Sequence, residues 1–148
     1  MNINKYNAER YPDPTAYEAL MDIMRNETKQ SKKQKSSNLA VVFICSPFAG
    51  NIPENTRKAC RYCRFAVERN RIPFAPHLLF PQFLDESYPE QRTLGIQMGL
   101  AFLEKCREVW VFGNITAGMR MEIERAGKRR IPVRYFNENC EEVQKCVN

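Results

Sequence analysis

The sequence predicts an α/β domain built on a parallel sheet with flanking helices, preceded by a helical N-terminal arm. Apolar runs of strand length alternate with amphipathic stretches of helix length through residues 39–137, which is the pattern of such domains. The runs 39–45 (LAVVFIC) and 109–112 (VWVF) lack polar alternation, as expected of strands buried on both faces of a parallel sheet. The length of 148 residues fits one domain, so we expect an arm at 1–38 and the α/β domain at 39–148.

The arm is polar and shows no strand pattern. Asp13 and Pro14 suit the N-cap and the first position of a helix, so we expect a helix over 14–28. Apolar side chains recur along it at helical spacing, namely Tyr17, Leu20, Met21 and Met24. This stripe suits packing on its own domain or on a second subunit, and both interpretations stay open. The Lys/Ser/Gln-rich stretch 30–38 predicts a flexible tether.

Strands and helices are expected to alternate through the domain. The strands are expected at 39–45, 72–75, 109–112 and 133–136, and the helices at 53–70, 90–105, 118–128 and 139–146. Right-handed crossovers between parallel strands place helices on both faces of the sheet. Ligands of such sheets bind beyond the carboxyl ends of the strands, near the point where the strand order reverses. Functional residues are therefore expected in the loops 46–52, 76–89 and 113–118.

The chain is basic, with a formal net charge of +6 and a pI of about 9.1. The basic residues gather at Lys29, Lys32, Lys33 and Lys35, and again at Arg125, Lys128, Arg129 and Arg130. Such groups suit an anionic ligand or nucleic acid. A solvated linker and a helix carboxyl end whose dipole favours cations explain them more simply. Nucleic acid is ranked last among the partners, because the stretch 29–35 lacks the interleaved aromatic residues of single-strand binding proteins.

The six cysteines do not form a recognisable metal site. Cys60 and Cys63 make a C-x-x-C pair, but a structural zinc site needs four ligands, and the chain has one histidine. The pair also fits one face of a helix, while Cys45 and Cys106 fit reduced core thiols. We therefore expect no metal and no cofactor.

Two further patterns concern location. No apolar run reaches the roughly 18 residues of a membrane-spanning helix. The opening stretch MNINKYNAERYPDP lacks the apolar core of a signal peptide. A cytoplasmic location without a membrane partner is the resulting expectation.

The loop after the first strand reads SPFAGN and precedes a helix. Backbone N–H groups at such a position can hold an anion or a sugar hydroxyl. The loop is neither a Walker loop nor a G-x-G-x-x-G loop, and an ordinary strand-to-helix turn is an equal alternative. Its candidate ligand-binding residues are Ser46, Pro47, Phe48 and Asn51.

The second loop, 76–89, is long and apolar, and long loops without secondary structure are often functional. The side chains suited to cover a base and to meet its polar edge are Phe80, Phe83, Leu84, Asp85 and Glu86. Phe83 is taken as a candidate for binding and Asp85 as a candidate for proton transfer. His77 is a further binding candidate, although a lone histidine more often has a structural role.

The third loop leads into a helix through TAGMRME, the sharpest signal of the chain. Glu122 is expected about one turn inside this helix, where the dipole stabilises an anion, so we expect an ionised carboxylate at neutral pH. Such a group suits displacement at a glycosidic carbon, and a glutamate that merely complements the dipole is the equal alternative. Glu124 points about 200° away around the helix and is excluded. The surrounding binding candidates are Asn114, Thr116, Gly118 and Met119.

Five motifs follow one another over roughly residues 39–137: SPFAGN, NTRKACRYCRFAVERNRIPFAPHLLFPQFLD, RTLGIQMG, CREVWVFG and TAGMRMEIERA. As an ordered set they resemble an uncharacterised bacterial and phage family that is similar to the nucleoside 2-deoxyribosyltransferases. The segment YPDPTAYEAL resembles the arm that this family often carries. The resemblance implies a flavodoxin-like, Rossmann-like sheet and a homo-oligomer.

The resemblance also implies a role for Glu122. In deoxyribosyltransferases a G-P-[FY] loop follows the first strand, and Ser46-Pro47-Phe48 stands in its place. Their D-x-G-x-x-x-E motif carries the nucleophilic glutamate, and Gly118 and Glu122 match it at the right spacing. Thr116 replaces the aspartate of the motif. Two further acidic positions of the family are replaced around 97–98 and 105–107.

Two functions follow from these residues. In the first, the chain is an enzyme in which Glu122 attacks C1′ of a (deoxy)ribosyl ligand, with Asp85 or water handling the proton. The N-glycosidic bond is then either transferred to another base or hydrolysed. In the second, the chain is a non-catalytic module that senses or sequesters a nucleotide. Retention of Gly118 and Glu122 favours the enzyme, and the missing acidic residues favour the binding module.

Overall fold

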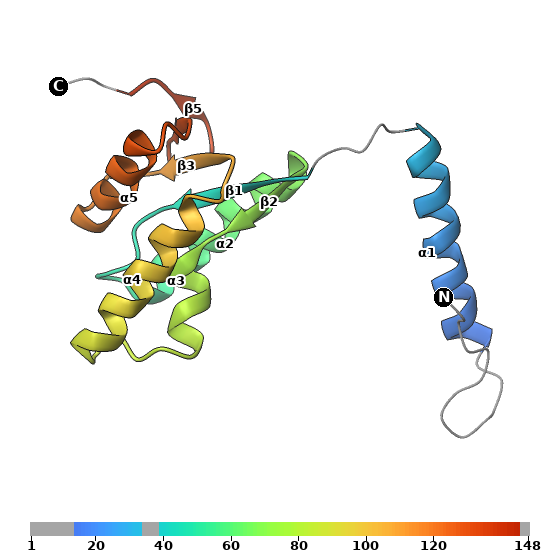
Figure 1. Ribbon diagram of the computed structural model, residues 1–148, viewed down its shortest axis with the longest axis horizontal. Coiled ribbons are helices and arrows are strands. Elements are labelled where there is room, and N and C mark those ends of the chain that lie inside the picture. Colours follow the sequence, from blue (N-terminus) through green and yellow to red (C-terminus); the bar gives the residue numbers. More distant parts are fainter. Residues whose placement is uncertain (1–13, 34–38, 146–148) are drawn as a thin grey trace. The chain divides into compact units, whose positions relative to one another are not determined.

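The structure is a computed structural model that describes residues 14–33 and 39–145. The chain divides into two compact units, Met1–Asn38 and Leu39–Asn148, and each is described by itself. Figure 1 shows the helix of the first unit and the sheet with its helices in the second.

Helix α1 (Pro14–Lys33) is the described element of the first unit. It continues past the predicted end at residue 28, because the residues that follow include lysines and a glutamine, which are good helix formers. The prediction of a tether was therefore wrong over residues 30–33; residues 34–38 and the predicted cap Asp13 lie outside the described residues. Along α1, Tyr17 is half-buried and Leu20 is 47% exposed.

A five-stranded sheet in the order β2-β1-β3-β4-β5 forms the centre of the second unit. β1 (Ala40–Cys45) pairs in parallel with β2 (Arg71–Phe74) on one side and β3 (Glu108–Phe112) on the other, and β4 (Val133–Phe136) pairs in parallel with β3. These four strands confirm the predicted α/β class and its flavodoxin-like order. Because the chain leaves β1 in one direction and returns on the other side, the strand order reverses between the carboxyl ends of β1 and β3.

The fifth strand corrects the prediction for the end of the domain. The sequence predicts a helix over 139–146, whereas β5 (Glu142–Val143) pairs antiparallel with β4. The Asn137 side chain accepts hydrogen bonds from the backbone N–H groups of Asn139 and Glu141, and Cys140 has a φ of 62°. These turn contacts reverse the chain, and a two-pronged ion pair between Arg134 and Glu142 joins the two strands.

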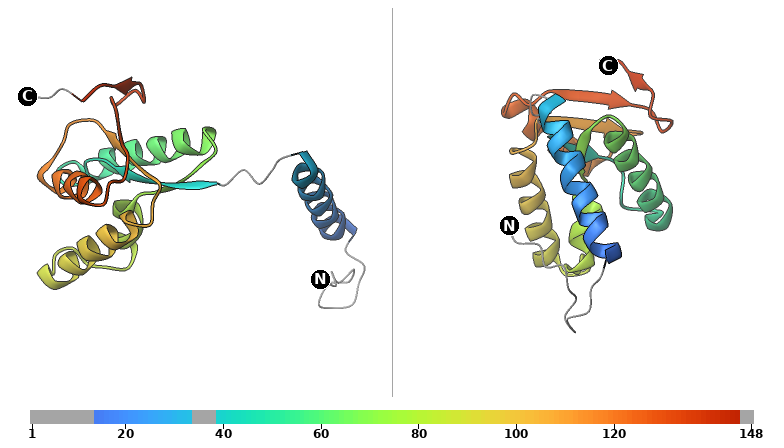
Figure 2. Two further views of the ribbon diagram at one scale, coloured as in Figure 1. Left: turned by 45° about the horizontal axis from the view of Figure 1, so that its top comes forward. Right: turned by 90° about the vertical axis from the view of Figure 1, so that its right-hand side faces the viewer.

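Alternating side chains of β1 define the two faces of the sheet. Val42 and Ile44 pack toward α2 (Ile52–Glu68), where the ring of Tyr62 stacks on that of Phe112. The opposite face of β1 packs toward α4 (Pro89–Leu103) and α5 (Ala117–Lys128). Figure 2 shows α2 and α4 on opposite sides of the sheet. No helix within the described residues is both long and apolar enough to cross a membrane.

The predicted loop 76–89 contains structure of its own. Helix α3 (Pro76–Leu79) and a 3₁₀ turn (Phe80–Gln82) occupy its first half, so the prediction of a stretch without secondary structure was wrong there. Pro76 supplies the fixed φ that suits a first helical position. The turn carries the chain from the end of β2 to the start of α4 and forms one wall of the site.

Candidate functional site

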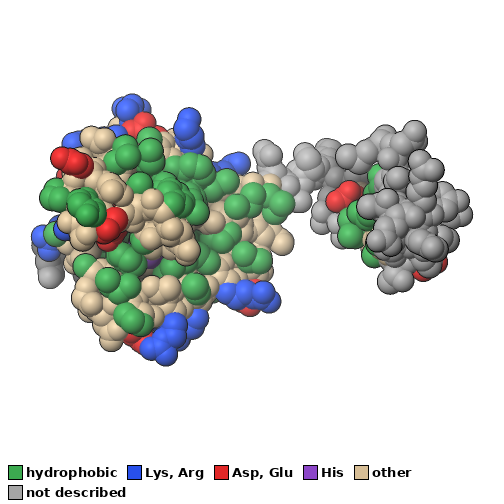
Figure 3. Space-filling model, turned by 90° about the horizontal axis from the view of Figure 1, so that it is seen from below, with side chains coloured by type: hydrophobic (Ala, Val, Ile, Leu, Met, Phe, Trp, Pro, Cys, Tyr) green, Lys and Arg blue, Asp and Glu red, His purple; other side chains and the backbone are tan. Residues whose placement is uncertain are grey.

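A pocket of about 360 Å³ lies at the carboxyl end of β1. Its floor comes from residues just after β1, and its walls come from α3, α4 and the start of α5. Figure 3 looks onto this part of the molecule, where hydrophobic side chains surround a hollow in which the single histidine is visible. The position agrees with the binding region expected at the reversal of strand order, and the volume lies in the range of small-ligand pockets.

Glu122 reaches the pocket from the second turn of α5. Its side chain is half-buried, and burial raises its pKa from the usual 4.5 to about 7. The prediction of a fully ionised carboxylate at neutral pH was therefore wrong, because the cost of desolvation outweighs the favourable helix dipole. At pH 7 the carboxylate and the carboxylic acid are present in comparable amounts.

Cys45, the last residue of β1, lies beside Glu122 and is fully buried. A hydrogen bond with the Cys45 thiol acts against burial and lowers the pKa of Glu122. Its Sγ also lies 3.9 Å from the carbonyl oxygen of Met119 in α5. The sequence showed Cys45 only as a core thiol, because its proximity to Glu122 arises from residues 77 positions apart.

Ser46 and His77 form a polar pair in the pocket lining. Ser46 Oγ lies 3.0 Å from His77 Nε2, and the ring of Phe48 lies 5.8 Å from the imidazole. Burial lowers the pKa of His77 to about 4, so the ring is neutral at pH 7. A neutral imidazole can orient a ligand through a hydrogen bond but holds no proton to donate as an imidazolium.

The start of α5 supplies Thr116, Gly118 and Met119 to the lining. Thr116 is the N-cap, and its Oγ1 accepts a hydrogen bond from the Met119 backbone N–H at 3.4 Å. The helix therefore begins at 117, close to the predicted 118. Where the related motif has an aspartate, this chain keeps a side chain that can still cap the helix.

Three further candidates from the first and third loops lie outside the pocket lining. Asn51 caps α2, accepting a hydrogen bond from the Glu54 backbone N–H at 3.3 Å. Pro47 is half-buried between two lining residues, and Asn114 is exposed on the loop after β3. Asn51 therefore has a structural role at a helix start.

The second loop also separates its candidates. Phe83 is 62% exposed and packs edge-on against Phe80, which does line the pocket. Asp85 lies outside the lining, and its Oδ1 accepts hydrogen bonds from the backbone N–H and the hydroxyl of Ser87. These donors lower the pKa of Asp85, which makes it a poor proton donor at neutral pH.

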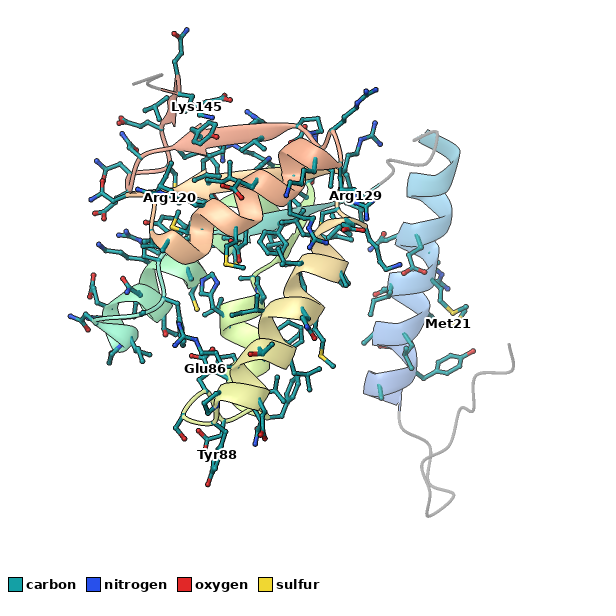
Figure 4. The ribbon with its side chains drawn as sticks, turned by 60° about the vertical axis from the view of Figure 1, so that its left-hand side comes forward. Met21, Glu86, Tyr88, Arg120, Arg129 and Lys145 are labelled. Carbon is teal, nitrogen blue, oxygen red and sulfur yellow. The ribbon has the colours of Figure 1, made fainter. Side chains whose placement is uncertain are left out.

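Two charged residues join the lining instead. Glu86 was considered as an acceptor for a base, whereas Arg92, in the first turn of α4, was not anticipated. Figure 4 shows Glu86 on the loop that leads into α4, with the side chain of Tyr88 pointing in a different direction from that of Glu86. The spacing of Arg92 and Ile96 along one side of α4 offered a signal, but α4 is apolar around much of its surface and the pattern did not distinguish its pocket side.

Two glycines let α4 pack closely against the neighbouring walls of the pocket. A Cβ on Gly99 would lie 3.5 Å from Pro76, and a Cβ on Gly95 would lie 3.4 Å from Leu84. Their spacing of four residues in RTLGIQMG places them on one side of the helix. This side faces α3 and the loop before α4, so the glycines bring three walls of the pocket together.

Comparisons with known proteins place this arrangement in context. Residues 40–136 match the model of a family described as a domain of unknown function, DUF7768. The chain belongs to this family. A comparison with curated proteins found no match.

A solved structure shares the fold. It is a 2-deoxyribosyltransferase from the psychrotolerant bacterium Bacillus psychrosaccharolyticus, with 18% sequence identity and a TM-score of 0.53. The similarity covers 71% of this chain and 77% of that one. The similarity shows that this DUF7768 member and the solved protein share an α/β fold.

The pocket combines few polar groups with apolar walls. It offers the Glu122 carboxyl group poised between its two protonation states, a second acidic side chain at Glu86, a neutral hydroxyl–imidazole pair, and one guanidinium. Within the described ranges, no cluster of three metal-ligating side chains occurs. This arrangement suits a small, partly apolar ligand that presents an electrophilic carbon or a proton to the carboxyl group.

Proposed function

We propose that this DUF7768 protein binds a nucleoside or nucleotide in the pocket and cleaves or transfers its N-glycosidic bond. The observation that carries the proposal is the placement of Glu122, half-buried in the lining of a pocket with aromatic and aliphatic walls. A base stacks well between apolar side chains such as Phe48 and Phe80. The sugar would then lie toward the carboxyl end of β1, with C1′ facing Glu122.

In this mechanism the ionised Glu122 attacks C1′ as the bond to the base nitrogen breaks. The base leaves with the bonding electrons and takes a proton from water, since Asp85 lies outside the lining. Water or a second base then attacks C1′ and releases Glu122. The fold shared with the solved deoxyribosyltransferase and the resemblance of Gly118 and Glu122 to the D-x-G-x-x-x-E motif of the deoxyribosyltransferases support this assignment.

The function is tested by incubating the protein with deoxynucleosides and their monophosphates and measuring free base by chromatography. Because the nucleophile must be ionised, base release should increase with pH through about 7 and should be lost in Glu122→Ala. Release that is unchanged in Glu122→Ala contradicts the site. Binding of the same compounds without any release contradicts the enzyme.

The second function is a non-catalytic module that senses or sequesters a nucleotide. Two observations favour it: His77 is neutral at pH 7, and Asp85 lies outside the pocket lining, so proton donors to a leaving base are few. Calorimetric titration with the same nucleotides, in parallel with the chromatographic assay, separates binding from turnover.

Self-association is part of the proposal. On α1, Leu20 of the apolar stripe is 47% exposed, and apolar side chains at helical spacing suit packing against another helix. The oligomer implied by the family resemblance would cover this stripe.

A further inference from the structure

We propose that Cys45 is a positioning residue, whose thiol donates a hydrogen bond to the carboxyl group of Glu122 and fixes the direction in which Glu122 faces the pocket. The inference rests on the proposed role of Glu122 as the reactive carboxylate. It assigns a task to a buried thiol that the proposed reaction does not otherwise use.

The fold brings the two side chains together from distant parts of the chain. Alternation along β1 directs Cys45 to the face that packs against α5, in one cluster with Met119. Met119 and Glu122 are three residues apart and share one side of α5. The Cys45 Sγ lies 3.9 Å from the Met119 carbonyl oxygen, so the thiol reaches the helix at the level from which Glu122 projects.

The chemistry of the thiol suits a donor. Burial and the neighbouring Glu122 raise the pKa of Cys45 well above its usual range, so the sulfur keeps its proton wherever Glu122 titrates. The Met119 carbonyl lies inside a helix that already supplies it with a backbone donor, and its distance from the sulfur is long. The thiol proton is therefore available to the carboxyl group, and its hydrogen bond strengthens when that group becomes an anion.

A thiol also suits the two requirements of the site, a Glu122 carboxylate that is held in one direction and a Glu122 pKa that stays raised. It is a weak donor, so it orients the carboxylate without stabilising the anion enough to cancel the effect of burial. The other charged or titratable groups of the pocket are His77 from α3, Glu86 from the loop before α4, and Arg92 from α4. Burial keeps His77 neutral above pH 5, and the variant Glu86→Gln serves as the control that removes the other carboxyl group of the pocket.

The direct test is the S–H stretching band of Cys45, recorded by infrared difference spectroscopy on the full-length, ligand-free protein and assigned with Cys45→Ala. The band should move to lower frequency as pH rises through about 7, and this movement should vanish in Glu122→Gln but persist in Glu86→Gln. Cys106 is the matched control, since its buried thiol lies 3.4 Å from a backbone carbonyl, that of Phe102. A Cys45 band that does not respond to pH in the wild type overturns the proposal.

A second test measures the pKa of Glu122 by NMR with ¹³C-labelled glutamate. Cys45→Ala should raise the value by about one pH unit, and Cys45→Ser, which keeps a donor, should restore it. Cys106→Ala should leave it unchanged. An unchanged pKa of Glu122 in a fully folded Cys45→Ala variant overturns the proposal.

Kinetics distinguishes this inference from the proposed function. In an active enzyme, Cys45→Ala should lower kcat/KM about fivefold at pH 7 and leave it nearly unchanged at about pH 9, where Glu122 is ionised in both proteins. A loss that is equal at all pH values indicates a merely structural role and overturns the inference. If the wild type releases no base, the proposed function fails, while the infrared and NMR results still decide on Cys45.

Discussion

Glu122 is subject to two opposing influences. A helix N-terminus favours an anion by about 0.3–1 kcal/mol, whereas a rise in pKa from 4.5 to about 7 corresponds to about 3 kcal/mol against the anion. Burial is therefore the larger effect. The position of Glu122 in the helix can be predicted from TAGMRME, but the depth of the pocket around it cannot, which explains the wrong expectation of full ionisation.

The raised pKa of Glu122 predicts that the protein loses stability as the pH rises. The folded-state pKa of Glu122 lies above the unfolded value, so its contribution is fully present below about pH 4.5 and is lost as pH rises through about 7. Between pH 4 and pH 9 the wild type should lose about 3 kcal/mol more free energy of unfolding than Glu122→Gln. Urea denaturation at both pH values measures this difference. Glu124→Gln, an exposed position on the same helix, should behave like the wild type.

His77 predicts the opposite pH dependence. Its pKa falls from 6.5 to about 4 in the folded state, so its contribution is fully present above pH 6.5 and is lost as pH falls toward 4. Between pH 7 and pH 4.5 the wild type should lose about 2 kcal/mol more than His77→Gln, which keeps a side chain able to bond to Ser46. Parallel denaturation curves for the two proteins at both pH values would contradict a buried, neutral imidazole.

At the scale of elements, the start of α5 decides where Glu122 projects. Thr116 caps this helix through Met119, and α5 contacts both α4 and β4. The alternation of strands and helices could be predicted from apolar periodicity, as could the start of α5 to within one residue. The end of the chain could not, because the turn at Asn137 and the pairing of β5 depend on contacts with β4.

Loss of the cap should loosen the site as well as the helix. Thr116→Ala should lower the free energy of unfolding by about 1 kcal/mol, while Thr116→Ser should retain most of the stability because it keeps the hydroxyl. Thermal or urea denaturation measures the effect. Equal stability of the alanine and serine variants would show that the hydroxyl contributes nothing to the helix start.

At the scale of the whole molecule, the described lining of the pocket comes from the α/β unit. Its lining spans residues 46 to 122, from the end of β1 to the second turn of α5, and the chain divides at Asn38. The arm therefore contributes no residue to the described lining. Its exposed apolar side chains instead suit the proposed self-association.

Deletion of residues 1–38 should separate the two roles. Nucleotide binding and base release by residues 39–148 should stay within about twofold of the full chain, since a pocket formed by one unit is expected to persist without the other. Light scattering should show a smaller assembly if α1 mediates association. Loss of binding together with an intact fold, judged by circular dichroism, would mean that the arm or a partner chain completes the site.

The sequence by itself determined the α/β class, the four parallel strands and the loops that would meet at their carboxyl ends. It did so because apolar periodicity and turn residues are local signals. Only the tertiary structure decided which loop residues share the pocket: Ser46, His77 and Glu122 do, and Asp85 does not. It also brought Cys45 beside Glu122. Burial, and with it the protonation of Glu122, depends on packing between segments far apart in the chain, which no local pattern records.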